Sequence, residues 1–343
     1  MSAASSGPPE GTTVEATVAS PGFLSTGKRE LLARQGILLA MCLCIAAFGI
    51  FSDRFFSVAN LMAVLRQSSI VGAIAIGVTV VVIGGNLDLS VGSLLSFATV
   101  LVVDLHDRIG PAGAILCMFA AVLVVGLLNG VLVGMLRLNS LIVTLGMLSV
   151  IQGVTLIYTG GQNVDIRHPE TTWFAVFGRG SVFGIPVPIV IFLLLAVAVE
   201  LMLRGLPFGR RVFAVGGNPT AAVFSGIRRG RVVLGTYLVS AMATGFAAVI
   251  MGSRVMGSQN NVGEGYELTA LAGVILGGAS LMGGSGSALR TVIGVLILGL
   301  IQNGLLMLGF LYSVQWLVTW GVIIVAVWFD LAARRGRLFS DIP

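Results

Sequence analysis

The chain has 343 residues, of which 56% are hydrophobic and only 10% are charged, and its mean hydropathy is +1.02. Soluble domains average about 25% charged residues, so this composition excludes a water-soluble domain and indicates a protein that spans a lipid bilayer. The net charge of +6 belongs to loops between apolar segments, which indicates membrane orientation rather than a nucleic-acid partner. The cysteines lie in apolar segments and the histidines in separate loops, so we expect no disulfide framework, no metal and no cofactor.

Residues 1–32 are rich in Ser, Gly, Thr, Ala and Pro and lack an apolar period, which predicts a disordered cytoplasmic tail. Within this tail, residues 22–29 nearly match the Walker pattern of an ATP-binding loop. Arg29 replaces the hydroxyl residue that would bind Mg²⁺, and no apolar strand precedes the glycines. We therefore expect a chain that has no ATP-hydrolysing site and is not itself an enzyme.

Ten apolar segments follow, most of them near the ~20 residues that a helix needs to cross a bilayer. They cover residues 35–52, 61–83, 88–105, 111–136, 140–159, 185–204, 232–252, 268–283, 288–309 and 314–332. The sequence therefore predicts an all-α, polytopic membrane protein with about ten transmembrane helices. Its transmembrane domain is expected over residues 33–335, with a cytoplasmic loop at 205–231 and a cytoplasmic tail at 336–343.

The positions of Lys and Arg predict how these segments are oriented. With ten crossings and a cytoplasmic N-terminus, 14 of the 20 Lys and Arg lie inside, and the C-terminus lies inside as well. Five lie outside, namely Arg54, Arg108, Arg167, Arg179 and Arg254. Most acids near loops, among them Glu264 and Glu267, also fall outside. This distribution follows the positive-inside rule.

Two stretches around residues 84–93 and 277–287 are short or broken by glycine. The segment 73–93 resembles 271–287, because both have a Gly-Gly pair and a turn before the next apolar run. Such an echo is expected if the chain contains two related halves, although shared composition alone would also produce it.

The first of these stretches places Asp88 between two apolar segments, where an unpaired carboxylate is costly. One interpretation makes Asn86, Asp88 and Ser90 part of a gate or latch near a translocation pathway, because broken backbone is tolerated where it lines a cavity. The other interpretation is that Asp88 only caps the helix that begins at Leu89. Both interpretations stay open.

Other polar residues lie within the apolar segments. Gly126, Gly130 and Gly134 form a small-residue stripe that predicts tight helix packing, with Asn129 beside it. Asn129 and Asn303 are also candidates for the pathway, because neutral amides suit a polyhydroxyl solute, but amides equally serve to join helices. We expect water to reach Glu200 at the cytoplasmic end of its segment. Apart from Asp88 no acid is expected at membrane depth, which argues against ion coupling.

The stretch from Arg204 to Arg231 carries six arginines and no acidic residue. It contains a complete short helix signature, in which Asn218 is the N-cap, Pro219 the first helical residue and Gly226 the left-handed residue that ends the helix. A lone helix of about two turns is unstable in water, and its apolar face, with Val223, Phe224 and Ile227 nearby, is expected to be exposed. We therefore predict that it docks on a cytoplasmic partner, the alternative being a plain basic loop.

Several motifs in order resemble the permeases of bacterial ribose-type ABC sugar importers, over roughly residues 35–333. They lie at residues 85–93, 208–218, 221–222 with 225–227, and 265–268 with the glycine pairs 277–278 and 283–284. The first motif departs from the family's usual Gly-Gly-Ile-Asp-Leu-Ser, because two residues, Asn86 and Leu87, precede Asp88.

The resemblance implies an inner-membrane permease subunit of an ATP-driven importer for a monosaccharide or similar polyol. It also implies three kinds of partner: a second permease that is identical or different, two cytoplasmic ATPase subunits that bind the ATP, and a periplasmic sugar-binding protein. The segment 218–227 would be the coupling helix seated in a groove of the ATPase. Its coupling residues would be Asn218, Pro219, Ala221, Ala222, Ser225, Gly226 and Ile227. The alternative function is an ion-coupled secondary transporter that acts alone in the lipid bilayer.

Overall fold

The computed structural model describes residues 45–46, 48–50, 52–311, 313–318, 320–321 and 324. The predicted tails at 1–32 and 336–343, with the Walker-like residues 22–29, lie outside the described residues. So do most of the first and last predicted apolar segments, 35–52 and 314–332.

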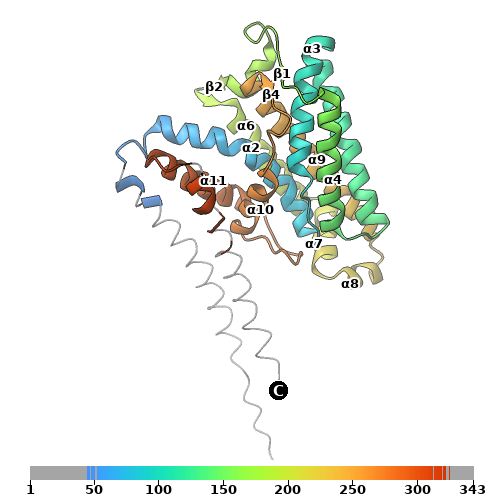
Figure 1. The fold of residues 1–343 in the computed structure, drawn as a ribbon. Helices are drawn as coiled ribbons and strands as arrows, with labels where there is room; N and C mark the ends of the chain where they lie inside the picture. Colours follow the sequence, from blue (N-terminus) through green and yellow to red (C-terminus); the bar gives the residue numbers. More distant parts are fainter. Residues whose placement is uncertain are drawn as a thin grey trace, which may run out of the picture.

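The described residues are predominantly helical, with four two-residue strands in two small antiparallel sheets (Figure 1). The long helices are α2 (Val58–Ile83), α3 (Val91–Gly130), α4 (Ser140–Thr159), α6 (Val187–Gly205), α9 (Arg229–Val255) and α11 (Ala288–Met307). The shorter ones are α5 (Val176–Arg179), α7 (Pro207–Gly217), α8 (Pro219–Phe224), α10 (Tyr266–Leu276), the π-helical turn η1 (Val131–Met135) and the 3-10 turn η2 (Trp173–Ala175). Strand β1 (Val164–Asp165) pairs with β4 (Gly257–Ser258), and β2 (Ser181–Val182) pairs with β3 (Ile185–Pro186).

Six stretches of helix in the described part of the chain are long and apolar enough to cross a membrane. Five of them match predicted segments closely, and α4 has the predicted bounds, 140–159. Local sequence explains these bounds: the Asn139 side chain accepts from the N–H of Leu141 at 2.9 Å, and Gly160 ends the helix with a φ of 61°.

The sixth stretch, Val91–Met135, has 45 residues. A straight helix of that length would measure about 67 Å, roughly twice the hydrocarbon core. It does not run straight, because Gly110 leaves the helical region with a φ of 78°, and Pro111 follows it. The stretch therefore consists of two legs, which correspond to the predicted segments 88–105 and 111–136.

The two legs of α3 run in opposite directions along α9. Gly252 of α9 lies against Val102 and Val103 in the first leg, while Gly245 lies against Phe119 in the second. Further along the second leg, a Cβ on Gly126 would lie 2.7 Å from the Cβ of Ala241. Gly130 and Gly134 approach Leu234 and Gly230 just as closely, so the predicted small-residue stripe is a tight packing surface for α9.

The predicted apolar segment 268–283 is not one continuous helix, so α10 alone is too short to cross the membrane. Helix α10 ends at Leu276 after 11 residues, which span about 16 Å, half of the hydrocarbon core. Gly278 then adopts a φ of 80° and begins the non-helical stretch that precedes α11. Both predicted breaks, around 84–93 and 277–287, therefore contain non-helical backbone.

The bundle has two distinct ends (Figure 1). One end carries α7 and α8, and we call it the α8 end; β1 and β4 lie at the opposite end. At the opposite end Arg179 donates to the backbone oxygen of Arg254 at 2.9 Å, and the N–H of Arg167 donates to Asp107. Residues predicted to share one side of the membrane thus lie together.

Helix α2 lies at the centre of the molecule, because 83% of the residues in its 18-residue apolar stretch are buried. In the corresponding stretch of α4 only 17% are buried. The main core cluster joins residues of α2, α3, α9 and α10, such as Ile74, Leu95, Ile250 and Val274. A second cluster around Ile83, Val215 and Tyr237 lies toward the α8 end. These two clusters position the elements described next.

Candidate functional site: a capped helix, two glycine turns and a cavity

Helix α8 has the caps that the sequence predicts. The Asn218 side chain accepts from the N–H of Ala221 at 2.9 Å, and Pro219 occupies the first turn. Gly226 has a φ of 81°; its N–H bonds the oxygen of Val223, and the N–H of Ile227 bonds the oxygen of Ala222. This pair of bonds closes the C-terminus as a Schellman motif. A six-residue helix is thus fixed at both ends by local chemistry.

One face of α8 packs on the protein and the other is exposed. Ala222 is 4% exposed, and Ile227 packs against the same cluster, so both side chains anchor the helix to its own chain. Val223 is 48% exposed and Phe224 is 87% exposed. The exposed apolar surface is therefore formed by Val223 and Phe224, without the Ile227 that the sequence analysis placed on it.

Helix α7 joins α8 to two glycine turns. We call residues 84–90 the first glycine turn and residues 277–287 the second. A Cβ on Gly216, near the end of α7, would lie 1.8 Å from the oxygen of Ile83, and the N–H of Gly284 donates to that same oxygen at 2.8 Å. A Cβ on Gly283 would lie 2.8 Å from the Cα of Gly85. Two residues before Asn218, three segments thus meet backbone to backbone.

The first glycine turn holds a buried polar network. The Oδ1 of Asp88 accepts from the N–H and the hydroxyl of Ser90, at 3.2 and 2.6 Å, and its Oδ2 accepts from the hydroxyl of Ser240 on α9 at 2.8 Å. Asn129 donates to the Ser90 oxygen at 2.9 Å, and Asn86 donates to the oxygen of Gly84 at 3.0 Å. Helix α3 begins at Val91, so the Asp88 carboxylate fixes Ser90, the residue before the helix, and joins the first glycine turn to α9.

A cavity of about 590 Å³, with both apolar and polar side chains in its wall, lies in the half of the bundle away from α8. It is bordered by the first half of α2, the start of α10, the second half of α11 and residues 315–320. Its polar and aromatic wall consists of the amides Gln67, Gln302, Asn303 and Gln315, the aromatic residues Tyr266, Trp316 and Trp320, and the charged residues Arg66, Arg254 and Glu264. This volume lies within the range of small-molecule sites, and aromatic walls with a few polar groups are typical of them.

Asn303 is the only one of the predicted pathway residues that lines this cavity, and its amide also joins two helices. It exchanges two hydrogen bonds with Asn60 on α2, at 2.8 and 3.0 Å. Asn86, Asp88, Ser90 and Asn129 line neither this cavity nor a smaller one of about 230 Å³. The structure therefore separates the predicted residues into a buried network at the first glycine turn and a cavity wall.

The smaller cavity is lined by Ser93, Gln152, Asn261, Glu264 and Glu267, together with Leu148. Glu267 lies against Gly92 of α3, and its Oε2 atom is buried without a hydrogen-bond partner. The sequence analysis placed Glu267 in an outer loop, because it precedes an apolar run. The structure instead places this carboxylate inside the bundle.

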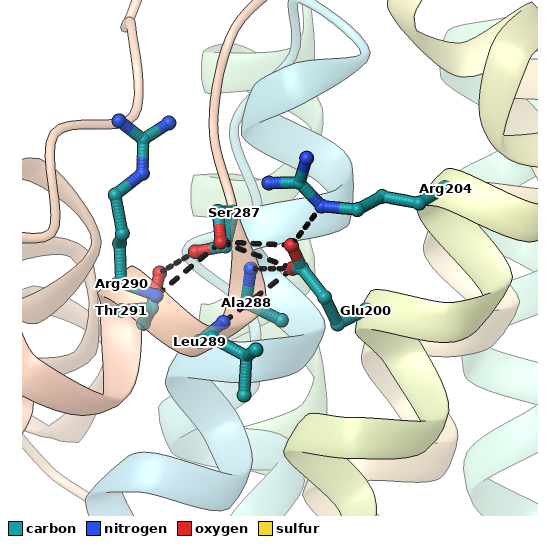
Figure 2. A network of polar contacts seen from close by, with 7 residues as sticks. All are labelled: Glu200, Arg204, Ser287, Ala288, Leu289, Arg290 and Thr291. Carbon is teal, nitrogen blue, oxygen red and sulfur yellow. Dashed lines mark hydrogen bonds and ion pairs between the residues drawn. The ribbon is translucent and has the colours of Figure 1, made fainter.

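Glu200 also differs from the expectation that water reaches it. It is 6% exposed and lies against the start of α11 (Figure 2). Its Oε2 accepts from the N–H of Ala288 at 2.7 Å, both carboxylate oxygens accept from the hydroxyl of Ser287 at 3.0 and 3.1 Å, and Arg204 pairs with it from the next turn of α6. Asp88 and Glu200 are thus both buried, and one oxygen of Glu267 is buried as well.

No group of three or more His, Cys, Asp and Glu side chains that could hold a metal ion is found among the described residues. The sequence analysis did not name Asn60, Tyr266 and Trp316 as site residues, because they come together only through the packing of α2, α10, α11 and the helical residues 313–318.

Comparison with known proteins agrees with this architecture. Residues 60–327 match the family model described as "Branched-chain amino acid transport system / permease component". The chain is 38% identical to the ribose import permease of Bacillus subtilis, over 88% of this chain and 93% of the relative. It is 36% identical to the ribose import permease of Escherichia coli strain K12, over 87% and 94%. It is 33% identical to the L-arabinose ABC transporter permease of Azospirillum brasilense, over 93% of each. No solved structure matches the chain.

These matches confirm the resemblance to ribose-type ABC importer permeases, and they do not favour a secondary transporter acting alone. Together with the apolar helices, they identify a multi-pass protein of the bacterial inner membrane. The chain belongs to the family of branched-chain amino acid transport system permease components and is a transport subunit of an ABC importer.

Proposed function

We propose that this chain forms the translocation pathway for a monosaccharide or similar polyol and takes its energy from separate ATPase subunits. The relatives are named as permeases for ribose, L-arabinose and D-allose, which supports a sugar although the family description names amino acids. In this proposal the chain crosses the membrane ten times, both of its ends are cytoplasmic, and it has no ATP-hydrolysing site. It works with a second permease subunit, two ATPase subunits and a periplasmic sugar-binding protein.

The observation that carries the proposal is the exposed surface of α8. The helix has only six residues, and so short a helix has little stability of its own, yet it is capped at both ends and exposes Phe224 to 87%. An exposed aromatic side chain on a rigid support is the usual centre of a protein–protein interface. The neighbouring arginines favour a cytoplasmic position for this end of the bundle, where an ATPase would bind.

The cavity supports the choice of solute. If the α8 end is cytoplasmic, the cavity lies in the periplasmic half of the bundle, where a binding protein would release its solute. Amide side chains both donate and accept hydrogen bonds, so Gln67, Gln302 and Asn303 suit hydroxyl groups without any change of charge. The ring of Trp316 offers an apolar surface for the carbon face of a sugar.

Docking through α8 is tested with the substitution Phe224→Ser. We expect the amount of ATPase subunit that copurifies to fall about 30-fold, because loss of a central aromatic contact costs about 2 kcal/mol or more. The matched control is Phe183→Ser, since Phe183 is 100% exposed on the β2–β3 turn at the opposite end. Both variants should reach the membrane in wild-type amounts. Equal copurification of the ATPase with both variants would reject α8 as the docking element.

The solute and the energy source are tested in proteoliposomes. The complete complex with binding protein and ATP should accumulate a labelled monosaccharide, and omission of ATP should abolish uptake. Ion-gradient-driven uptake by this chain alone would contradict the proposal and support the secondary-transporter alternative.

A further inference from the structure

Glu200 is placed where two helices from distant parts of the chain meet. It lies near the end of α6, whereas its partners Ser287, Ala288 and Leu289 form the start of α11 (Figure 2). Its Oε2 accepts from the N–H of Ala288 at 2.7 Å and more weakly from that of Leu289 at 3.5 Å. The first N–H groups of a helix have no partner within the helix, so the carboxylate of α6 caps α11 from outside.

This contact is strong because charge and geometry act together. A negative charge is stabilised at a helix N-terminus, and charged hydrogen bonds are roughly twice as strong as neutral ones. Glu200 is 6% exposed, so little water competes for its oxygens. Arg204, one turn further along α6, pairs with the same carboxylate and lies three residues before α7 begins at Pro207.

A second contact ties the end of α7 to the second glycine turn, next to the start of α11. At the end of α7, a Cβ on Gly217 would lie 3.8 Å from the Cα of Gly284, and Gly216 approaches the N–H of Gly284. The second glycine turn leads directly into Ser287 and α11. The start of α11 is therefore held by the chain on either side of α7, immediately before Asn218 and α8.

Helix α11 connects this joint to the cavity. Its first turn bonds α2 through the hydroxyls of Thr79 and Thr291 at 2.8 Å. Its second half contributes Leu298, Gln302 and Asn303 to the cavity wall. A displacement of α7 and α8 that moves the start of α11 thus also moves the residues that border the cavity, since a helix moves as a rigid rod.

We propose that Glu200 is a positioning residue that couples the start of α11 to α7 and α8. When α7 and α8 move, α11 then moves with them, so that force applied at α8 reaches the cavity. This inference rests on the proposed function. Glu200 touches neither the cavity nor the exposed face of α8. Its role is to transmit movement, and removing it should separate ATP hydrolysis from transport while leaving both partner sites intact.

The test compares Glu200→Ala with Glu200→Gln in the complete complex, in proteoliposomes with binding protein and labelled ribose as the probe. We expect Glu200→Ala to lower the amount of ribose moved per ATP hydrolysed about tenfold, because several charged hydrogen bonds are lost. The rate of ATP hydrolysis and the KM for ribose should stay near wild type, so the loss appears in kcat of transport alone. Glu200→Gln retains an oxygen that accepts from Ala288 and Ser287, and it should restore transport per ATP to within about threefold of wild type.

Ser287→Ala is the milder variant if Glu200→Ala fails to assemble. It removes the hydroxyl bonds at 3.0 and 3.1 Å, and with them the bond that the hydroxyl accepts from the N–H of Arg290 at 3.3 Å, but it leaves the bond from Ala288 to Glu200 in place. We expect transport per ATP to fall about threefold. Ser149→Ala, on the exposed face of α4, is the matched control and should have no effect. A wild-type ratio in Ser287→Ala or Glu200→Ala overturns the inference, and so does a parallel loss of hydrolysis and transport. If instead the wild-type complex moves no ribose with ATP, the proposed function itself is at fault.

Discussion

The two glycine turns reverse the chain in the same way but are anchored differently. In the first, Gly85 has a φ of 77° and its N–H bonds the oxygen of Val82, while in the second Gly278 has a φ of 80° and bonds that of Ile275. The next residue of each turn also bonds back five positions, at 3.1 and 3.2 Å. The echo in the sequence therefore corresponds to the same local backbone, although α10 is far shorter than α2.

The difference lies in the origin of the acid that steadies each following helix. The first turn supplies its own, since Asp88 bonds Ser90 two residues later. The second turn takes its carboxylate from Glu200 on α6, 87 residues before Ser287. The start of α3 is thus fixed by its own segment and by α9, whereas the start of α11 depends on the chain that leads to α8. This contrast suits a rigid frame, formed by the first glycine turn with α2, α3 and α9, and a moving element, formed by α11 with α7 and α8.

The largest effect on stability is expected from removal of the carboxylate in the first turn. Asp88→Ala leaves the buried hydroxyls of Ser90 and Ser240 without their acceptor, and Asn129 loses an ordered partner. The expected loss is about 3 kcal/mol in the free energy of unfolding, because unsatisfied buried polar groups are costly. The measurement is unfolding in mixed detergent micelles, with Asp53→Ala at an exposed position as the control. Equal stability of the two variants would show that the first turn is not a fixed frame.

A smaller effect is expected where the turns meet α7. Gly216→Ala places a Cβ 1.8 Å from the oxygen of Ile83, so the backbones must separate. Overpacking of this kind costs about 1–3 kcal/mol. The neighbouring Gly217→Ala is a close control, because its Cβ meets only the Cα of Gly284 at 3.8 Å. The two variants should therefore differ in thermal unfolding midpoint, and a common midpoint would contradict the close approach of the three segments.

Local sequence predicted most of the helices and both interruptions of helical backbone, around residues 84–93 and 277–287. The caps of α8 were readable because Asn218, Pro219 and Gly226 act within a few residues of one another. Hydropathy overestimated the apolar segment 268–283, because it counts apolar side chains and does not register that Gly277 and Gly278 end the helix. Predicted bounds were otherwise close, since long apolar helices need little information beyond their length.

The candidate site was only partly readable. Asp88 could be predicted because it is an acid between two apolar segments and its partner Ser90 lies two residues later. The position of Glu200 against Ser287 could not, because nothing near residue 200 records which helix start will pack there. Asn303 was flagged as an amide at depth, but its pairing with Asn60 and its place in the cavity depend on how α2 and α11 cross.

The smallest of these effects concerns the hydrogen bond between the first turn of α11 and α2. The hydroxyls of Thr79 and Thr291 lie 2.8 Å apart. Each hydroxyl also lies within hydrogen-bond distance of a backbone oxygen one turn earlier: Thr79 of the oxygen of Ala75, and Thr291 of the oxygen of Ser287. Thr291→Val keeps the shape of the side chain and removes the contact, so we expect a loss of about 1 kcal/mol in the free energy of unfolding.

Thr79→Val should cost a similar amount, and the double variant should cost little more than either single one, because both remove the same interhelical bond. Thr269→Val, on α10, supplies the control, since the Thr269 hydroxyl bonds only the oxygen of Gly265 within its own helix. Additive losses in the double variant would mean that the two hydroxyls do not interact. If the losses are not additive, α11 is supported by α2 near its start while Glu200 holds its first turn.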